Sequence, residues 1–177
     1  MPTETSNSPA RILVVEDDMG DQILIQESLQ TSPVRKKVHV VSDGEEALEY
    51  LYRTGRYAPP VESHRPDLIL LDLNMPRLGG KEVGARLKAD PEMKAIPIVA
   101  FTTSDREEDV AACYALGFNC YVKKPTDFEE FQAALLHLER FWLQVSLPPP
   151  RSGRMASPAV PRKDRENGAP FTNNPLH

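Results

Sequence analysis

The sequence predicts an α/β fold in which a five-stranded parallel sheet carries helices on both faces. Five short apolar or β-branched runs have strand length, and a helical pattern follows each of them. Strand–helix units repeated in this order build parallel sheets, because each helix returns the chain to the start of the next strand. The runs are also almost continuously apolar, which is typical of strands that are covered on both sides.

The elements follow one another in regular order. The predicted strands are RILVV (11–15), KVHVV (37–41), LILLDL (68–73), IPIVAF (96–101) and NCYVK (119–123). The helical patterns after them are QILIQESLQ (22–30), EEALEYLYR (45–53), GKEVGARLKA (80–89), REEDVAACYAL (106–116) and DFEEFQAALLHLERFW (127–142). A longer connection, 54–66, is expected to be a surface loop.

Several residues mark where helices begin and end. Asp43 is expected to cap the second helix, and Gly117 suits the end of the fourth. Ser104 with Glu107, and Thr126 with Glu129, have the spacing of capping boxes for the last two helices. On the last helix an apolar stripe with steps of three and four residues predicts the face that packs on the core: Phe128, Phe131, Leu135, Leu138 and Trp142.

Composition divides the chain into three parts. Residues 1–9 are polar, 10–147 hold the predicted domain, and 148–177 are rich in Pro, Ser, Asn and Gly, so both ends are expected to be disordered. A net charge of −5 argues against nucleic acid as the main partner. We find no signal-peptide pattern and no apolar run long enough for a membrane span, which predicts a cytoplasmic protein. Two cysteines form no disulfide framework.

Polar side chains stand at the ends of four predicted strands. In open parallel sheets these carboxyl ends share one edge, where ligands bind. Each residue also has an ordinary explanation, such as a helix cap, a turn or a solvated charge. Their common edge favours a site. They are Glu16, Asp17 and Asp18 after the first strand, Asp72 after the third, Thr102 and Thr103 after the fourth, and Lys123 and Lys124 after the fifth.

Electrostatics indicates that the acidic group needs a cation or a proton. Three ionised carboxylates, Glu16, Asp17 and Asp72, repel one another by roughly 3 kcal/mol per pair at separations of ~5 Å and an effective dielectric constant of ~20. Carboxylate oxygens with no His or Cys beside them select Mg²⁺ or a similar ion. Mg²⁺ beside an aspartate, a hydroxyl and a lysine is a combination of groups that suits phosphoryl transfer, and Asp72 would be the nucleophile.

The segments ILVVEDD, LILLDLNMP, IPIVAFTTS and YVKKP resemble the signature segments of CheY-like receiver domains of two-component response regulators. The resemblance covers residues 10–143 and implies a flavodoxin-like (βα)5 fold with strand order 2-1-3-4-5. It implies Asp72 as phosphoacceptor, Mg²⁺ as the metal, and a sensor histidine kinase as partner. The other implied site residues are Glu16, Asp17 and the Asn74 backbone carbonyl for the metal, Thr102 as switch hydroxyl, Tyr121 as switch aromatic, and Lys124 beside the phosphate.

The resemblance carries further expectations. Asp17 and Asp72 would bind the metal directly and Glu16 largely through water, and the Lys124–Pro125 bond would be cis. Two departures are Glu16 in place of the more usual Asp, and Gly79 where many receivers carry Asp. Phosphorylation would draw Thr102 toward the phosphoryl group, let Tyr121 rotate, and repack the surface of helix four, strand five and helix five.

The chain most resembles the single-domain regulators paired with bacterial phytochromes. The features are the long 54–66 loop, CYVKKPTDF and the helix ending ERFWLQVSLPP. Apolar residues at this ending, Phe141, Trp142 and Leu143 among them, predict a homodimer through the C-terminal helix. The alternative is that they fold back on their own domain.

Three other functions compete with this interpretation. A haloacid-dehalogenase-like phosphohydrolase also uses an aspartate and Mg²⁺, but it needs a second acid where this chain has Asn74. A flavodoxin-like cofactor binder would need a phosphate loop in place of EDDMGDQ, whose carboxylates repel phosphate. A receiver-like interaction module that is never phosphorylated stays open.

Overall fold

The computed structural model describes residues 8–150, which form a five-stranded sheet with the order β2-β1-β3-β4-β5. Every neighbouring pair is parallel, which confirms the predicted fold class and strand order. The strands are β1 (Ala10–Val15), β2 (Lys36–Val41), β3 (Leu68–Leu71), β4 (Ile98–Thr102) and β5 (Cys120–Lys123). The predicted disorder of 1–9 and 148–177 falls mainly on residues outside the described range.

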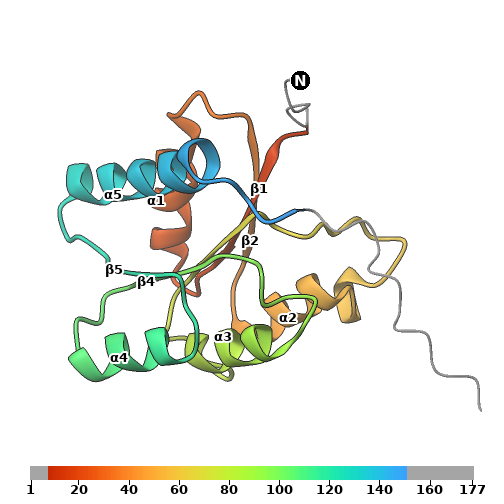
Figure 1. Cartoon of the computed structure of the whole chain (residues 1–177). Helices are drawn as coiled ribbons and strands as arrows, with labels where there is room; N and C mark the ends of the chain where they lie inside the picture. Colours follow the sequence, from red (N-terminus) through yellow and green to blue (C-terminus); the bar gives the residue numbers. More distant parts are fainter. Residues whose placement is uncertain (1–7, 151–177) are drawn as a thin grey trace, which may run out of the picture.

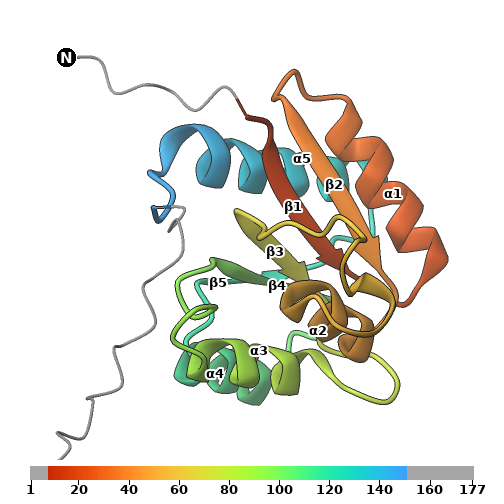
Figure 2. The same ribbon diagram turned by 90° about the vertical axis from the view of Figure 1, so that its right-hand side faces the viewer.

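Helices cover both faces of the sheet, as predicted. They are α1 (Met19–Gln30), α2 (Gly44–Tyr52), α3 (Gly80–Ala89), α4 (Glu107–Ala115) and α5 (Phe128–Arg140). A short 3₁₀ turn, Gly55–Tyr57, lies in the long loop, and a π-helical turn, Phe141–Val145, continues α5. Figures 1 and 2 show α1 and α5 together on one face and α2, α3 and α4 on the other. Within residues 8–150 no helix is long and apolar enough to cross a membrane.

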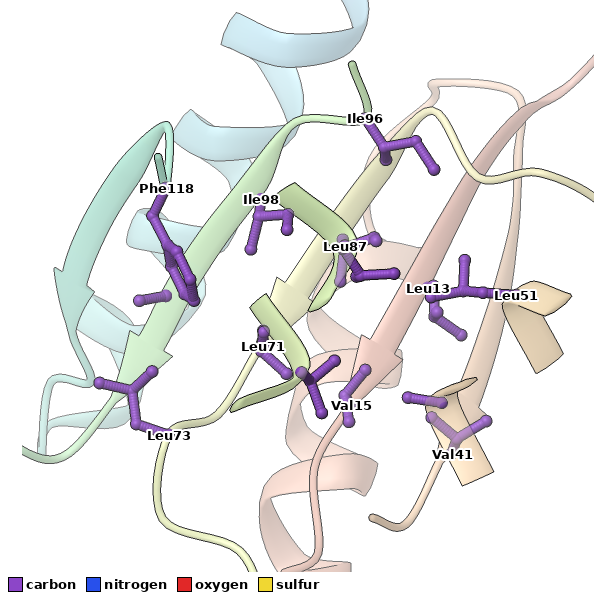
Figure 3. Packing of buried hydrophobic residues seen from close by; sticks show 14 of the residues in the cluster. Leu13, Val15, Val41, Leu51, Leu71, Leu73, Leu87, Ile96, Ile98 and Phe118 are labelled. Atoms are coloured by element: carbon purple, nitrogen blue, oxygen red, sulfur yellow. The ribbon is translucent and has the colours of Figure 1, made fainter. Parts of the chain in front are cut away.

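The sheet separates two hydrophobic clusters, because successive side chains of a strand point to opposite faces. In β1, Leu13 and Val15 belong to the cluster under α2 and α3, whereas Ile12 and Val14 belong to the cluster under α1 and α5. Figure 3 shows the first cluster, where Leu87 of α3 meets strand side chains. A sheet anchored on both faces gives its strand ends fixed positions.

Three element boundaries differ from the predicted ones in ways that matter for the site. Strand β3 ends at Leu71, two residues earlier than predicted, so Asp72 directly follows it. Strand β4 continues to Thr102. Helix α1 begins at Met19, three residues before the predicted start, because Asp18 caps it by accepting a hydrogen bond from the Asp21 backbone N–H at 2.8 Å.

Both predicted capping boxes are wrong. Helix α5 is capped by Asp127, which accepts from the Glu130 backbone N–H at 3.0 Å; its carboxylate is a stronger acceptor than the hydroxyl of Thr126 one position earlier. Helix α4 begins after Arg106 with no side-chain cap bond, because the Ser104 hydroxyl donates instead to a carboxylate inside the helix.

Other markers of helix ends are confirmed. Asp43 caps α2 through the Glu46 backbone N–H at 2.8 Å. Gly117 ends α4 with a φ of +94°, a conformation that residues with a Cβ rarely adopt.

The apolar stripe of α5 packs largely as predicted. Phe131 and Leu135 are buried, and Leu138 and Trp142 pack at the edge of the same cluster. The predicted core position of Phe128 is wrong, because its side chain is 50% exposed. As the first helical residue, its side chain points back past the helix start.

A buried ion pair joins the end of α5 to the start of β2. The Lys36 Nζ atom lies 2.6 Å from Glu139 Oε1, and the two side chains are only 7% and 2% exposed. Lys36 also donates to the carbonyls of Ser32 and Val34. The last helix is therefore fixed to the sheet by charge as well as by apolar packing.

Candidate functional site

Strand register brings the acidic residues of β1 and β3 together. Val15 pairs with Leu71, so the next residues, Glu16 and Asp72, leave the sheet side by side. Both side chains are buried, with Glu16 1% and Asp72 7% exposed. The predicted meeting of these two strand ends is confirmed.

Lys124 directly follows the edge strand β5 and reaches this pair from there. Its Nζ atom lies 2.6 Å from Glu16 Oε2 and 3.4 Å from Asp72 Oδ2. A third carboxylate, Asp21 of α1, lies 2.7 Å from the same nitrogen. The lysine side chain is 4% exposed, so this is a buried ammonium ion held by three carboxylates.

Asp21 was not predicted as a site residue. The segment DDMGDQ reads as a loop because it is acidic and contains Gly, yet α1 already begins at Met19. The signal that could have found it is the three-residue spacing from Asp18 to Asp21, which is typical of a helix cap.

Three side chains form a candidate metal centre. Glu16, Asp17 and Asp72 each offer an oxygen, and these oxygens lie within 4.8 Å of one another. In residues 8–150 it is the one such group of His, Cys, Asp or Glu side chains. A set made of carboxylates fits a hard divalent cation. Asp17 is exposed, so the cluster opens to solvent on its side.

Burial and charge oppose each other in this cluster. Burial raises the pKa of Glu16 to about 7, and the charge of Asp72 adds to the rise, although Lys124 counteracts it. Burial alone would lower the pKa of Lys124, but hydrogen bonds to Asp21 and Glu16 outweigh it and raise this pKa above its usual value. The site therefore holds more acidic groups than its single lysine neutralises, and it favours a proton or a further cation.

Thr102 and Tyr121 are both connected to one loop residue. Thr102 is fully buried, and its Oγ1 accepts a hydrogen bond from the Ser104 backbone N–H at 3.3 Å. The Tyr121 hydroxyl donates to the Ser104 carbonyl at 2.9 Å. The Ser104 hydroxyl donates to Asp109 at 2.6 Å, and Lys81 of α3 donates to the same carboxylate at 2.8 Å. No sequence pattern predicts this link between α3, α4 and the loop.

The segment after β3 forms a turn at Asp72. The Asn74 backbone N–H donates to Asp72 Oδ1 at 3.4 Å, a long contact of the Asx-turn type. The role of the Asn74 carbonyl as a metal ligand stays a prediction. Within residues 8–150 the one cis peptide bond joins Pro59 to Pro60, so the predicted cis Lys124–Pro125 bond is wrong.

Comparison with known sequences identifies relatives over most of the chain. The response regulator receiver domain family matches residues 12–136. Response regulator Rcp1 of Synechocystis is 42% identical over 147 residues, which span 82% of this chain and 98% of that protein. The probable methanogenesis regulatory protein FilR2 of Methanothrix harundinacea is 30% identical over 138 residues, 78% of this chain and 86% of the relative.

Solved structures agree with the sequence comparison. The crystal structure of the phosphorylated cyanobacterial phytochrome response regulator RcpA superposes with a TM-score of 0.76 at 42% identity, covering 81% of this chain and all of that one. The Mn²⁺-bound form of Rcp1 gives a TM-score of 0.75 at 41% identity, with 80% and 100% covered. The bacteriophytochrome response regulator RtBRR gives 0.64 at 40% identity, with 81% and 86% covered.

Proposed function

The chain belongs to the response regulator receiver domain family, and from that premise we propose that it accepts a phosphoryl group from a sensor histidine kinase on Asp72. The observation that carries the proposal is the buried Lys124 ammonium, which lies within hydrogen-bond reach of both Asp72 and Glu16 at one edge of the sheet. An aspartate nucleophile needs such a positive group, because the incoming phosphoryl oxygens are negatively charged.

The metal in this proposal is Mg²⁺. Glu16, Asp17, Asp72 and the Asn74 carbonyl would hold it, and the carboxylate cluster supports a hard divalent ion. The relative whose structure was solved in an Mn²⁺-bound form supports a divalent metal of this kind. When bound, the ion neutralises charge on the phosphoryl oxygens.

The side chains have separate tasks in the transfer. An Asp72 carboxylate oxygen forms the new bond to phosphorus while the bond from phosphorus to the donor, a kinase histidine nitrogen, breaks. Lys124 pairs with a phosphoryl oxygen, and the Thr102 hydroxyl donates to another. Burial of Glu16, Asp72 and Lys124 strengthens these interactions because little water screens them.

The switch would run through Ser104. If Thr102 turns to the phosphoryl group, it gives up the hydrogen bond from Ser104, and the loop then no longer holds the Tyr121 hydroxyl in its present place. Tyr121 lies on β5 between α4 and α5, so its movement would alter the α4–β5–α5 surface.

Incubation with Mg²⁺ and acetyl phosphate, followed by intact-mass measurement, tests the phosphoacceptor. We expect a gain of one phosphoryl group that Asp72→Asn abolishes, because the amide is no nucleophile for this reaction. The same protein with beryllofluoride, a mimic of the phosphoryl group, should shift backbone NMR signals between residues 102 and 125. A chain that gains no mass from acetyl phosphate or from any of a panel of histidine kinases would instead be an interaction module without phosphorylation.

The kinase partner in this proposal is a bacteriophytochrome. The names of the relatives support it, since the chain matches RcpA and RtBRR, a phytochrome and a bacteriophytochrome response regulator, over most of their length. The protein would act in the cytoplasm, with no nucleic acid or membrane as partner and with no chemistry beyond its own phosphorylation and dephosphorylation.

The same proposal includes a homodimer through the C-terminal segment. Trp142 and Leu143 pack against their own domain, so the intramolecular alternative holds for these two residues. Phe141, Val145 and Leu147 are 52%, 64% and 93% exposed, and they are the apolar residues left for a partner.

The phosphohydrolase and cofactor-binding alternatives are not favoured. The receiver family matches residues 12–136, which span all but the start of β1 and the end of α5, and Asn74 leaves the first alternative without its second acid. Carboxylates rather than a phosphate-binding loop follow β1, which counts against the second.

A further inference from the structure

The Lys124 ammonium has no free donor in this structure. An ammonium group carries three N–H bonds, and Lys124 has three carboxylate neighbours: Glu16 at 2.6 Å, Asp21 at 2.7 Å and Asp72 at 3.4 Å. Its two close contacts are not with the phosphoacceptor. If Lys124 is to bind a phosphoryl oxygen on Asp72, it has to weaken one of the other two contacts.

Exposure indicates which contact is given up. The Glu16 side chain is 2% exposed and also accepts the Asp18 backbone N–H at 3.0 Å, so it is fixed in a dry environment. The Asp21 side chain is 28% exposed. A carboxylate that already meets water loses an ion partner at lower cost than a buried one, because water replaces the lost hydrogen bond.

Helix capping alone does not account for the position of Asp21. An acidic residue in the first turn of α1 stabilises the helix through the helix dipole. In a capping box its carboxylate would also return to the N–H of the capping residue, Asp18. That N–H is bonded to Glu16 instead, and the Asp21 carboxylate turns to Lys124.

We propose that Asp21 is a positioning residue that competes with the phosphoryl group for Lys124. It holds the lysine at the edge of the site in the resting protein, and its loss as a partner is part of the cost of forming the phosphorylated state. This inference rests on the proposed function, because it needs an anion on Asp72. It predicts that the protein binds phosphoryl-like anions less tightly than it would without the Asp21 carboxylate.

Beryllofluoride binding at saturating Mg²⁺ tests the proposal without depending on turnover. We expect Asp21→Asn to bind beryllofluoride about two- to tenfold more tightly than the unaltered chain, the range expected for a partly exposed ion pair. Titration followed by NMR gives the affinity. The matched control is Glu27→Gln, which removes one charge from an exposed position on the same helix and should leave the affinity unchanged.

A double-mutant cycle separates competition for Lys124 from a general loss of negative charge. In a Lys124→Met background, Asp21→Asn should give no further gain in affinity. Equal or weaker beryllofluoride binding by Asp21→Asn alone, or a gain that persists without Lys124, would overturn the inference. The proposed function fails in a different way, since the unaltered chain would then bind no beryllofluoride and gain no phosphoryl group.

Discussion

Glu16 shows how a single buried side chain links this site to pH. Its carboxyl group is almost fully enclosed, lies next to Asp72, and shares one lysine with two other acids. A longer side chain than the more usual Asp lets it reach both Lys124 and the Asp18 backbone N–H. The same enclosure that fixes its position makes its ionised form costly.

We expect Glu16 to lower stability as pH rises in metal-free protein. Burial raises its pKa from the ordinary value of 4.5 to about 7 in the folded chain, so the folded state binds the extra proton between these pH values. The contribution is present below pH ~4.5 and lost through pH ~7, up to about 3 kcal/mol. Urea unfolding in EDTA measures it, with Glu16→Gln as the comparison. If the difference in the free energy of unfolding between the two proteins does not change with pH, the prediction is contradicted.

Most site residues could be predicted from the sequence because each directly follows or ends a strand. Glu16, Asp72, Thr102 and Lys124 inherit their positions from a parallel sheet, whose strand ends share one edge. Asp21 could not be found in this way, since its position depends on where α1 begins and how the helix is oriented.

At the scale of elements, the glycine pair at the start of α3, the capping residue Gly79 and the first helical residue Gly80, sets how closely that helix approaches the site. A Cβ atom on Gly80 would lie 2.1 Å from the Asp72 carbonyl oxygen and 2.9 Å from the Leu73 Cα. Both are backbone atoms of the segment that carries the phosphoacceptor. The start of α3 is thus packed directly against the chain at Asp72.

We expect Gly80→Ala to lower the free energy of unfolding by about 1–3 kcal/mol, because the backbone at Asp72 has to move. Gly79→Ala is the matched control. Its Cβ would meet the Leu73 carbonyl oxygen only at 3.4 Å, and its φ of −73° suits any residue, so the loss should stay below about 1 kcal/mol. Urea unfolding of the two variants measures the difference, and equal losses would show that the approach of α3 is not limiting.

The elements themselves were largely predictable, and their ends were less so. Apolar runs and helical periodicity located all five strand–helix units because burial on both faces imposes a strong pattern. The predicted caps of α4 and α5 are wrong because neighbouring residues compete for the capping role. Asp127 replaces Thr126, and Ser104 is engaged by Asp109. Such competition depends on side-chain directions that spacing alone does not contain.

At the scale of the whole molecule, the exposed apolar residues after α5 decide the proposed assembly. We expect Phe141→Ser to shift the protein toward monomer in sedimentation velocity at micromolar concentration, because it removes a large apolar side chain from the proposed interface. Tyr114→Ser is the control, since Tyr114 on α4 is also 52% exposed. The interface would be ruled out if the unaltered chain is monomeric, or if only Tyr114→Ser dissociates the dimer.

The buried pair of Lys36 and Glu139 has a practical consequence for joining this domain to other proteins. A fusion point placed before Glu139 would leave the Lys36 ammonium enclosed without its counter-ion, a situation that typically costs about 3–5 kcal/mol. A fusion point after Ser146 keeps the pair and the packing of Trp142. Because Lys36 lies on β2, the second strand of the chain depends on this C-terminal segment. A sensor or reporter built on this domain therefore has to keep the native chain through Ser146.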